Sequence, residues 1–408
     1  MAAGDDRIRK YYLFRAVTSF SLWIPFWTLW ANKYLDSLFL LTIVDAAFWS
    51  TMICFQLPAG LLGDKYGRKA MLFIGEATFA GGVLAFGLST EFWQFLASNI
   101  LWASGVCFIV SGDTPFLYDT LLELKRQNEF IAVMAKAWAV IAVMGATACV
   151  VGGIIVQYIL PDRLDLTLII SAFVGLTGTF TVLFLKEPKV DRTKFGSFRI
   201  QLSVGWNHVK TSRAIVVLIM FQIIIEIALY VMAVFRSVYM NEDLDLNYLY
   251  VGLFIGAFTI VGGAVAAQAG KIEQRLGEKN SLLFILLAIV GSFGIVFLVK
   301  SSVAIVIQFL IYAISNLVSP ITNGYINKRV DSQHRSTVVS IGTLLFTIVL
   351  APVEMGFGFL ATAWGTRESL LILALCILPI GFYLLSVWNK EVDVSRKKTK
   401  KIRALKQF

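Results

Sequence analysis

The chain has 408 residues, of which 58% are hydrophobic and 15% are charged, with a formal net charge of +10. A soluble domain is about half apolar and about a quarter charged, and no polar segment here is long enough for a large soluble domain. The apolar residues fall in many runs of about 18 to 26, the length that crosses the hydrocarbon core as a helix. In hydrocarbon, helices satisfy their own backbone hydrogen bonds, so we expect an all-α integral membrane protein. Four cysteines within apolar runs and two distant histidines indicate no metal site or cofactor.

The apolar runs predict twelve transmembrane helices. In chain order these cover residues 9–32, 38–62, 70–90, 93–117, 131–159, 165–185, 213–239, 247–268, 281–299, 302–326, 336–361 and 368–389. A long charged segment follows the sixth helix and indicates two halves. We therefore expect an N-terminal six-helix bundle at 1–186, a cytoplasmic linker at 187–212, a C-terminal six-helix bundle at 213–389 and a basic tail at 390–408.

The distribution of positive charge predicts the orientation of these helices. The termini and the connections from even to odd helices carry 29 Lys and Arg, whereas the opposite connections carry 4. Cytoplasmic loops hold the excess of positive residues, so we expect both termini in the cytoplasm and the protein in the cytoplasmic membrane. The basic tail would lie near anionic lipid, and because its charge is not a patch on a fold we expect no nucleic-acid partner.

The clearest motif lies between the second and third predicted helices. It runs from Gly60 to Lys69 and reads Gly-Leu-Leu-Gly-Asp-Lys-Tyr-Gly-Arg-Lys. Gly60 and Gly63 leave one helix face bare, so that another helix can approach closely. Gly67 permits a tight turn with a positive φ.

A related stretch, from Gly270 to Lys279, begins 210 positions later, between the eighth and ninth predicted helices. It keeps both outer glycines and the final Lys, but Gln274 stands for Asp64 and Glu278 for Arg68. The two copies indicate an internal duplication.

The complete first motif and its faded second copy resemble those of the major facilitator superfamily of secondary transporters. The resemblance implies two pseudo-symmetric six-helix bundles that alternate access to a central site, with helices 1, 4, 7 and 10 lining the cavity. It also implies a conformational latch, in which the Asp of the motif meets the start of helix 11. The residues assigned to this latch are Gly60, Asp64, Gly67, Arg68 and Asp119, the last as the acid that pairs with Arg68.

Charged residues within membrane helices are costly and therefore point to function. Glu226 lies about 13 residues into the seventh predicted helix, or roughly 20 Å deep, with Gln222 and Tyr230 on the same face. We expect Glu226 to exchange a proton or to pair with a cationic substrate; the alternative is a permanently protonated structural group. Asp45 and Glu354, toward the outer ends of helices 2 and 11, are further candidates for proton coupling, or else gate or ion-pair residues.

Three cations also fall within predicted helices. Arg15, Lys136 and Arg236 could bind an anionic group, form ion pairs or extend to the interface. Glu76 and Asp113 are expected to pair with nearby bases.

A polar stripe on the tenth predicted helix is the main candidate for the substrate cavity. It carries Gln308, Tyr312, Asn316, Ser319 and Asn323. Such a stripe lines a water-filled cavity or joins helices through hydrogen bonds. Aromatic residues of the first helix, Trp23 among them, could add an apolar wall, or could face lipid.

We therefore expect a monomeric secondary transporter of a small organic solute, not an enzyme. Proton-coupled efflux of amphipathic compounds is the favoured prediction, and a proton-coupled uptake symporter for a small polar solute is the alternative. A third hypothesis is a nutrient sensor that does not transport. Two departures count against the drug exporter: the fifth helix lacks a Gly-Pro pair before Gly152 and Gly153, and the fourth has Asn99 and Ser104 where many relatives carry an Arg.

Overall fold

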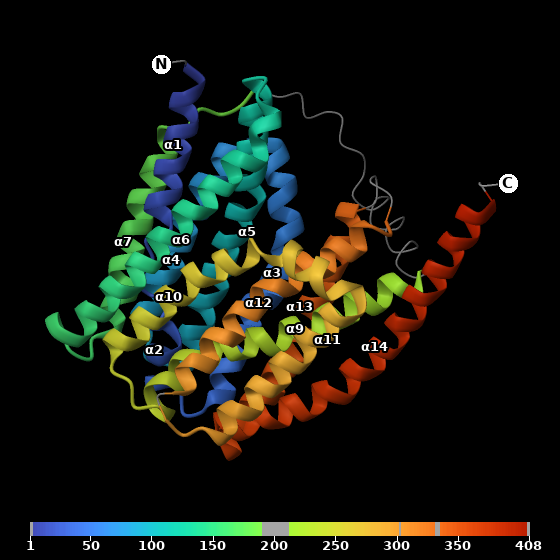
Figure 1. The fold of residues 1–408 in the computed structure, drawn as a ribbon. Helices are drawn as coiled ribbons and strands as arrows, with labels where there is room; N and C mark the ends of the chain where they lie inside the picture. Colours follow the sequence, from blue (N-terminus) through green and yellow to red (C-terminus); the bar gives the residue numbers. More distant parts are fainter. Residues whose placement is uncertain (1–2, 190–211, 302, 331–334, 406–408) are drawn as a thin grey trace. The chain divides into compact units, whose positions relative to one another are not determined.

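The computed structural model describes residues 3–189, 212–301, 303–330 and 335–405 (Figure 1). Most of the expected linker at 187–212 and the last three residues of the basic tail lie outside these ranges. The described elements are helices: α1 (Ala3–Thr18), α2 (Trp27–Tyr34), α3 (Leu38–Tyr66), α4 (Arg68–Gly87), α5 (Phe92–Glu123), η1 (Gln127–Glu129), α6 (Phe130–Ile154), η2 (Ile155–Ile159), α7 (Leu164–Leu183), α9 (Arg213–Val238), η3 (Tyr239–Asp243), α10 (Tyr248–Ala266), α11 (Ala269–Leu298), α12 (Ala304–Asn327), α13 (Arg335–Trp364) and α14 (Thr366–Leu405).

Among the described residues, eleven helices are long and apolar enough to cross a membrane. The remaining expected span, the first in the chain at 9–32, is not one continuous helix, so the prediction of a single helix there was wrong. It is divided into α1 and α2 around Pro25, which has no backbone N–H and cannot continue a helical ladder. The backbone amide of Leu22, which lies within this break, donates to the Ser171 hydroxyl of α7, at 2.9 Å. A neighbouring helix thus supplies the partner that hydrocarbon cannot.

Several other helix ends differ from the sequence-based boundaries. α14 does not end at 389 but continues to Leu405, so the described part of the expected basic tail is helical. α11 begins at Ala269 and not at 281, because the connection from α10 is itself helical on both sides of a kink at Gly277. α6 and α9 each end in a π-helical turn, η2 and η3.

By its contacts the chain divides into two compact units. The first comprises Met1–Phe195, Val234–Ile260 and Glu354–Thr362, and the second comprises Gly196–Ala233, Val261–Val353 and Ala363–Phe408. The first unit therefore contains α1 to α7 together with the end of α9, most of α10 and one stretch of α13. The second contains most of α9 and of α13, the end of α10, and α11, α12 and α14. The boundaries expected from sequence assign 234–260 and 354–362 to the second bundle.

Small residues allow close helix packing within the first unit. A Cβ on Gly75 of α4 would lie 2.8 Å from the backbone nitrogen of Ile109 of α5, and one on Gly153 of α6 would lie 2.9 Å from the carbonyl oxygen of Tyr248 of α10. Since membrane helices associate largely through such contacts, glycines at these positions fix the packing of the unit.

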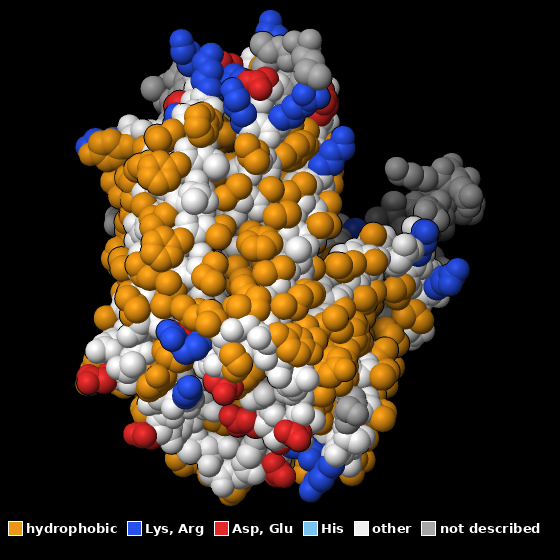
Figure 2. Space-filling model, turned by 90° about the vertical axis from the view of Figure 1, so that its left-hand side faces the viewer, with side chains coloured by type: hydrophobic (Ala, Val, Ile, Leu, Met, Phe, Trp, Pro, Cys, Tyr) orange, Lys and Arg blue, Asp and Glu red, His pale blue; other side chains and the backbone are white. Residues whose placement is uncertain are grey.

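Large hydrophobic side chains are exposed along α6 and α7, where Trp138, Phe173 and Phe180 are 58–62% exposed. Figure 2 shows a face on which hydrophobic side chains dominate, with Lys and Arg concentrated toward the upper end. An apolar surface of this extent is expected where helices contact acyl chains.

Candidate functional site

The carboxyl group of Glu226 lies near the middle of the span Arg213–Asp243, on the part of α9 that belongs to the second unit. The side-chain amide of Gln222 donates to Glu226 Oε1 at 2.9 Å. The Gln222 carbonyl oxygen in turn accepts a hydrogen bond of 3.0 Å from the Thr322 hydroxyl of α12. Glu226 is half-buried, and this chain of hydrogen bonds directs it toward α12. Gln222 and Glu226, two of the three residues predicted to share a face of α9, are thus hydrogen-bonded to each other, and Thr322 of α12 is a partner that the sequence pattern did not single out.

The polar stripe of α12 consists of two sets of side chains. Gln308 is fully buried and its amide points to the sulfur of Met232 of α9, at 4.0 Å. Tyr312, Asn316 and Asn323 are half-buried; Asn316 donates to the Tyr312 carbonyl oxygen and Asn323 to the Ser319 hydroxyl. These hydrogen bonds within one helix give the amides partners, and Tyr312 and Asn316 also lie against Gly262 of α10. Gln308 instead joins helices.

Trp23 packs within the first unit rather than standing alone. Its ring meets that of Trp102 of α5 edge to face, with the centroids 4.5 Å apart, and its indole nitrogen is buried without a hydrogen-bond partner among the described residues. Phe26 and Trp30 are also buried, with the Trp30 indole donating to the Phe86 carbonyl oxygen. Phe26 and Trp30 therefore lie in the interior of the unit, and the alternative in which the aromatic residues face lipid does not hold for these two.

The residues of the first motif meet at the junction of α3 and α4. Arg68 pairs with Asp64 at 2.7 Å, and its Nε lies 4.0 Å from Asp119 of α5. Gly67 has φ +101, as the predicted turn requires. A Cβ on Gly63 of α3 would lie 3.2 Å from the Met71 side chain of α4 and 3.9 Å from the Ser111 carbonyl oxygen of α5, whereas one on Gly60 meets no atom of the described chain within 4 Å. Gly63 therefore admits neighbouring helices as expected, and the expectation is not met at Gly60.

Glu187 completes this junction and was missed from the sequence, where it fell at the start of the linker. Its two carboxylate oxygens accept hydrogen bonds from the backbone amides of Arg68, at 2.9 Å, and Lys69, at 2.6 Å. These are the first residues of α4, whose amino terminus carries partial positive charge and unsatisfied N–H groups. An acid directly after the sixth span, in Lys-Glu-Pro, was the available signal.

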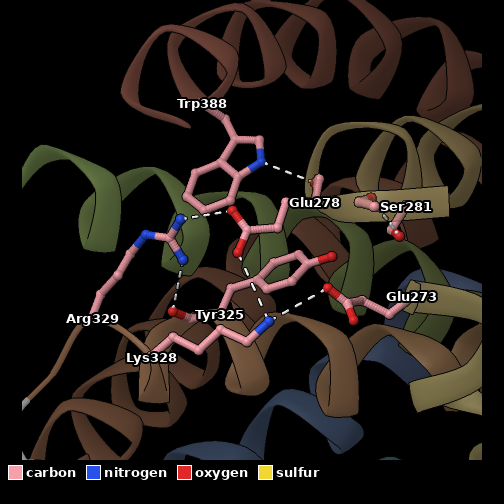
Figure 3. Close-up of polar contacts among 8 residues, drawn as sticks. Glu273, Glu278, Ser281, Tyr325, Lys328, Arg329 and Trp388 are labelled. Atoms are coloured by element: carbon pink, nitrogen blue, oxygen red, sulfur yellow. Dashed lines mark hydrogen bonds and ion pairs between the residues drawn. The ribbon is translucent and has the colours of Figure 1, made fainter. Parts of the chain in front are cut away.

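The second copy of the motif forms its own cluster of charges within the second unit (Figure 3). Glu278 pairs with Arg329 at 2.9 Å and with Lys328 at 3.8 Å, and Lys328 also lies 3.5 Å from Glu273. The Arg329 guanidinium lies 4.5 Å from the ring of Trp388, whose indole donates to the Glu278 carbonyl oxygen. The cluster joins α11, α12 and α14.

A second set of ionisable side chains lies within the first unit, where Glu76 is buried and Arg15 and Asp113 are partly buried. Asp113 of α5 accepts a hydrogen bond of 2.9 Å from the Tyr11 hydroxyl and lies 3.5 Å from Arg15 of α1. Glu76 of α4 is 2% exposed and experiences the charges of both Arg15 and Asp113. Arg15 therefore holds an ion pair rather than extending to the interface.

The remaining candidates differ in burial. Lys136 is exposed on α6, whereas Arg236 is 7% exposed and its guanidinium lies over the ring of Phe258, 5.2 Å from the centroid. Asp45 and Glu354 are 5% and 0% exposed and both belong to the first unit. No group of three or more His, Cys, Asp or Glu side chains that could hold a metal ion is found among the described residues.

Many apolar spans, two copies of a charged turn and membrane-buried acids define a polytopic membrane transporter. The family model described as Major Facilitator Superfamily matches residues 12–353, and the chain belongs to this family. Its members are membrane transporters, not enzymes.

Curated relatives include multidrug resistance protein 2 of Bacillus subtilis (strain 168), which is 24% identical over 85% of each chain. The inner membrane transport protein YajR of Escherichia coli (strain K12) is 30% identical, over 35% of this chain and 30% of its own length. Among solved structures, the nucleoside transporter NupG has a TM-score of 0.75 at 13% identity, covering 93% of this chain and 98% of its own. The D-xylose-proton symporter has a TM-score of 0.70 at 13% identity, covering 93% and 97%. These structures share the twelve-helix fold of the superfamily.

Proposed function

We propose that this protein is a proton-coupled secondary transporter that moves a small organic solute across the cytoplasmic membrane by alternating access. Glu226 carries the proposal, because it is an ionisable side chain near the middle of a membrane span and is hydrogen-bonded toward a polar helix face. Transporters of this kind bind substrate and coupling ion near the midplane.

The geometry gives the proton a means of acting on the helices. Ionised Glu226 accepts a charge-assisted hydrogen bond from Gln222, which orients the amide so that its oxygen accepts from Thr322. A proton on Glu226 weakens the first bond and frees the amide to turn, which loosens the link between α9 and α12. Proton binding and the packing of the lining helices are thereby coupled.

We infer that the favoured direction is efflux, with amphipathic organic cations as substrates. A relative that matches 85% of both chains is named a multidrug resistance protein, and α12 carries half-buried polar side chains but no charged residue. Proton-coupled uptake of a small polar solute is the second candidate, since a structural neighbour is a D-xylose-proton symporter. Both candidates use the same acid.

The proposed arrangement in the membrane follows from the charge distribution. Both termini face the cytoplasm, and the monomer is the transporting species. The first motif acts as a latch on the cytoplasmic side, in which Asp64 meets the amino terminus of α13 when that side closes, favoured by the partial positive charge of the helix end.

Flux in proteoliposomes tests the proposal, with ethidium as the amphipathic cation and a pH gradient imposed in each direction. Efflux by antiport predicts ethidium movement opposite to that of protons, with proton movement followed by a pH-sensitive dye. Without an ionisable group at this position, the proton gradient cannot drive the conformational change through Glu226. We therefore expect Glu226→Gln to lower gradient-driven flux about tenfold or more.

Glu91→Gln is the matched control, because Glu91 is exposed and its side chain caps no helix. This variant should transport as the wild type does. Full gradient-driven flux in Glu226→Gln would overturn the role of Glu226. Movement of D-xylose with protons, and none of ethidium, would select the uptake alternative.

A further inference from the structure

The outer half of α13 packs antiparallel against the start of α3 within the first unit. The Thr362 hydroxyl accepts a hydrogen bond of 3.0 Å from the backbone amide of Phe39. Moving back along α13, a Cβ on Gly358 would lie 2.6 Å from the methyl carbon of Thr42. The two helices therefore contact each other at two successive turns, Phe39 with Thr362 and Thr42 with Gly358.

Asp45 and Glu354 form the next level of this contact. Each lies one helical turn beyond the pair of Thr42 and Gly358, and their carboxyl groups are within hydrogen-bonding reach of each other. Glu354 is fully buried, and neither of its oxygens receives a hydrogen bond from a conventional donor in the described part of the chain. A carboxyl group thus faces a carboxyl group in a dry environment.

Two ionised carboxylates have only acceptor oxygens, so they cannot hydrogen-bond to each other and their like charges repel. One proton between them turns the same contact into a hydrogen bond, as in pairs of catalytic aspartates. The charged group that acts on Glu354 among the described residues is Asp45. α9 packs on α13 through Phe235 and Phe357, and it carries the cation Arg236, whose guanidinium lies over the ring of Phe258.

We propose that Asp45 and Glu354 form a proton-binding clasp that holds the outer end of α13 against α3, and that loss of the shared proton releases it. The two helices come from different halves of the duplicated chain, since α3 precedes and α13 follows the segment after the sixth span. Their separation is therefore the kind of movement that alternating access needs.

The clasp deepens the proposed function and rests on it for its role in transport. Protons that arrive from the outside would close it, and departure of the proton would allow it to open. The contact is present while the proton is bound, so it is strongest at low pH and is lost as the pH rises.

Distance measurement between spin labels tests the clasp without a substrate. The labels are placed at Asp36→Cys, just before α3, and Trp364→Cys, the last residue of α13, both exposed positions, after replacement of the four native cysteines. Distances are recorded in proteoliposomes from about pH 5 to about pH 9. In the otherwise unchanged protein, we expect the ratio of long to short distances to rise by up to about tenfold per pH unit through the transition.

Glu354→Gln and Asp45→Asn keep the size of the side chain and supply an amide donor in place of the proton. Each should retain the short distance at every pH. Glu354→Ala should favour the long distance at every pH. To show that this variant is folded, a parallel sample that keeps its four cysteines is treated with a thiol-reactive dye. Its buried thiols should react as slowly as those of the wild type. A distance that does not depend on pH before these substitutions, or an unchanged pH response in Glu354→Gln, would overturn the clasp.

The same measurement in Glu226→Gln separates this inference from the proposed function. A retained pH response there, together with lost flux, supports both. A retained response with full flux would remove Glu226 as the coupling acid and leave the clasp standing.

Discussion

Glu278 and Arg329 form the same pair as Arg68 and Asp119, with the charges exchanged. Glu278 stands 210 positions after Arg68, and Arg329 stands 210 positions after Asp119. The first pair lies at 4.0 Å and the second at 2.9 Å, each joining the helix after a motif to the helix that follows it. The duplication has therefore kept the ion pair while exchanging which helix carries the positive charge.

The exchange predicts that the second pair tolerates reversal. Glu278→Arg or Arg329→Glu alone places like charges together, and we expect each to lower stability by about 1–3 kcal/mol, because both side chains are partly buried. The double variant should recover most of this loss. The midpoint of thermal denaturation in detergent, followed by dye reaction of the buried thiols of Cys107 and Cys149, measures the effect. No recovery in the double variant would show that Trp388 and Lys328, not the pair itself, set the stability of the cluster.

The turns of the two motifs offer a matched pair of glycines. Gly67 and Gly277 have φ of +101 and +76, a conformation that side chains rarely adopt. A Cβ on Gly67 would also lie 2.7 Å from the Glu187 carboxylate, whereas one on Gly277 meets nothing within 4 Å. We expect Gly277→Ala to lower stability by about 1–3 kcal/mol through backbone strain, and Gly67→Ala to lower it further.

Thermal denaturation is measured for both glycine variants, for Glu187→Ala, and for Gly67→Ala combined with Glu187→Ala. The comparison separates backbone strain at the glycine from displacement of the Glu187 carboxylate. In the Glu187→Ala background, the additional cost of Gly67→Ala should fall toward that of Gly277→Ala. Equal losses for both glycines in the unaltered chain would show that Glu187 moves aside freely.

The sequence was informative wherever one helix or one short turn decides the outcome. Span length and composition predicted eleven of the crossings, and the spacing of the motifs predicted the positive φ of Gly67. The division of the first span could also have been foreseen, since Pro25 interrupts the run. Its consequence could not, because the amide of Leu22 finds its partner on α7, 149 positions away.

Contacts between distant helices lay beyond the sequence. Asp45 and Glu354 were each singled out because acids are costly in a membrane, but nothing in a single sequence shows that they face each other. Glu187 was overlooked because it follows the sixth span, where an acidic residue is expected to belong to a solvated linker. Its role depends on the start of α4, more than a hundred positions earlier.

The partly buried pair of Arg15 and Asp113 makes a prediction about charge balance in the first unit. Arg15→Met would leave Asp113 and Glu76 without their cation, and we expect the free energy of unfolding to fall by about 1–3 kcal/mol, because a partly buried acid loses its charged partner. Combined Arg15→Met and Asp113→Leu should be milder than Arg15→Met alone, since both charges of the pair are removed. Yield of folded protein and thermal denaturation measure this. An equally severe double variant would point to Glu76 as the acid that depends on Arg15.

Two glycines of α13 test the packing on which the clasp depends. A Cβ on Gly358 would clash with the side chain of Thr42, whereas one on Gly356, two residues earlier, meets nothing within 4 Å. Gly358→Ala should therefore push the outer end of α13 away from α3 and lengthen the distance between labels at Asp36 and Trp364 at low pH, while Gly356→Ala leaves it unchanged. Thr42→Ala should partly restore the short distance in Gly358→Ala, because it removes the atoms that collide. If Gly358→Ala keeps the short distance at low pH, close approach of the backbones is not required, and the two carboxyl groups can meet across a looser contact.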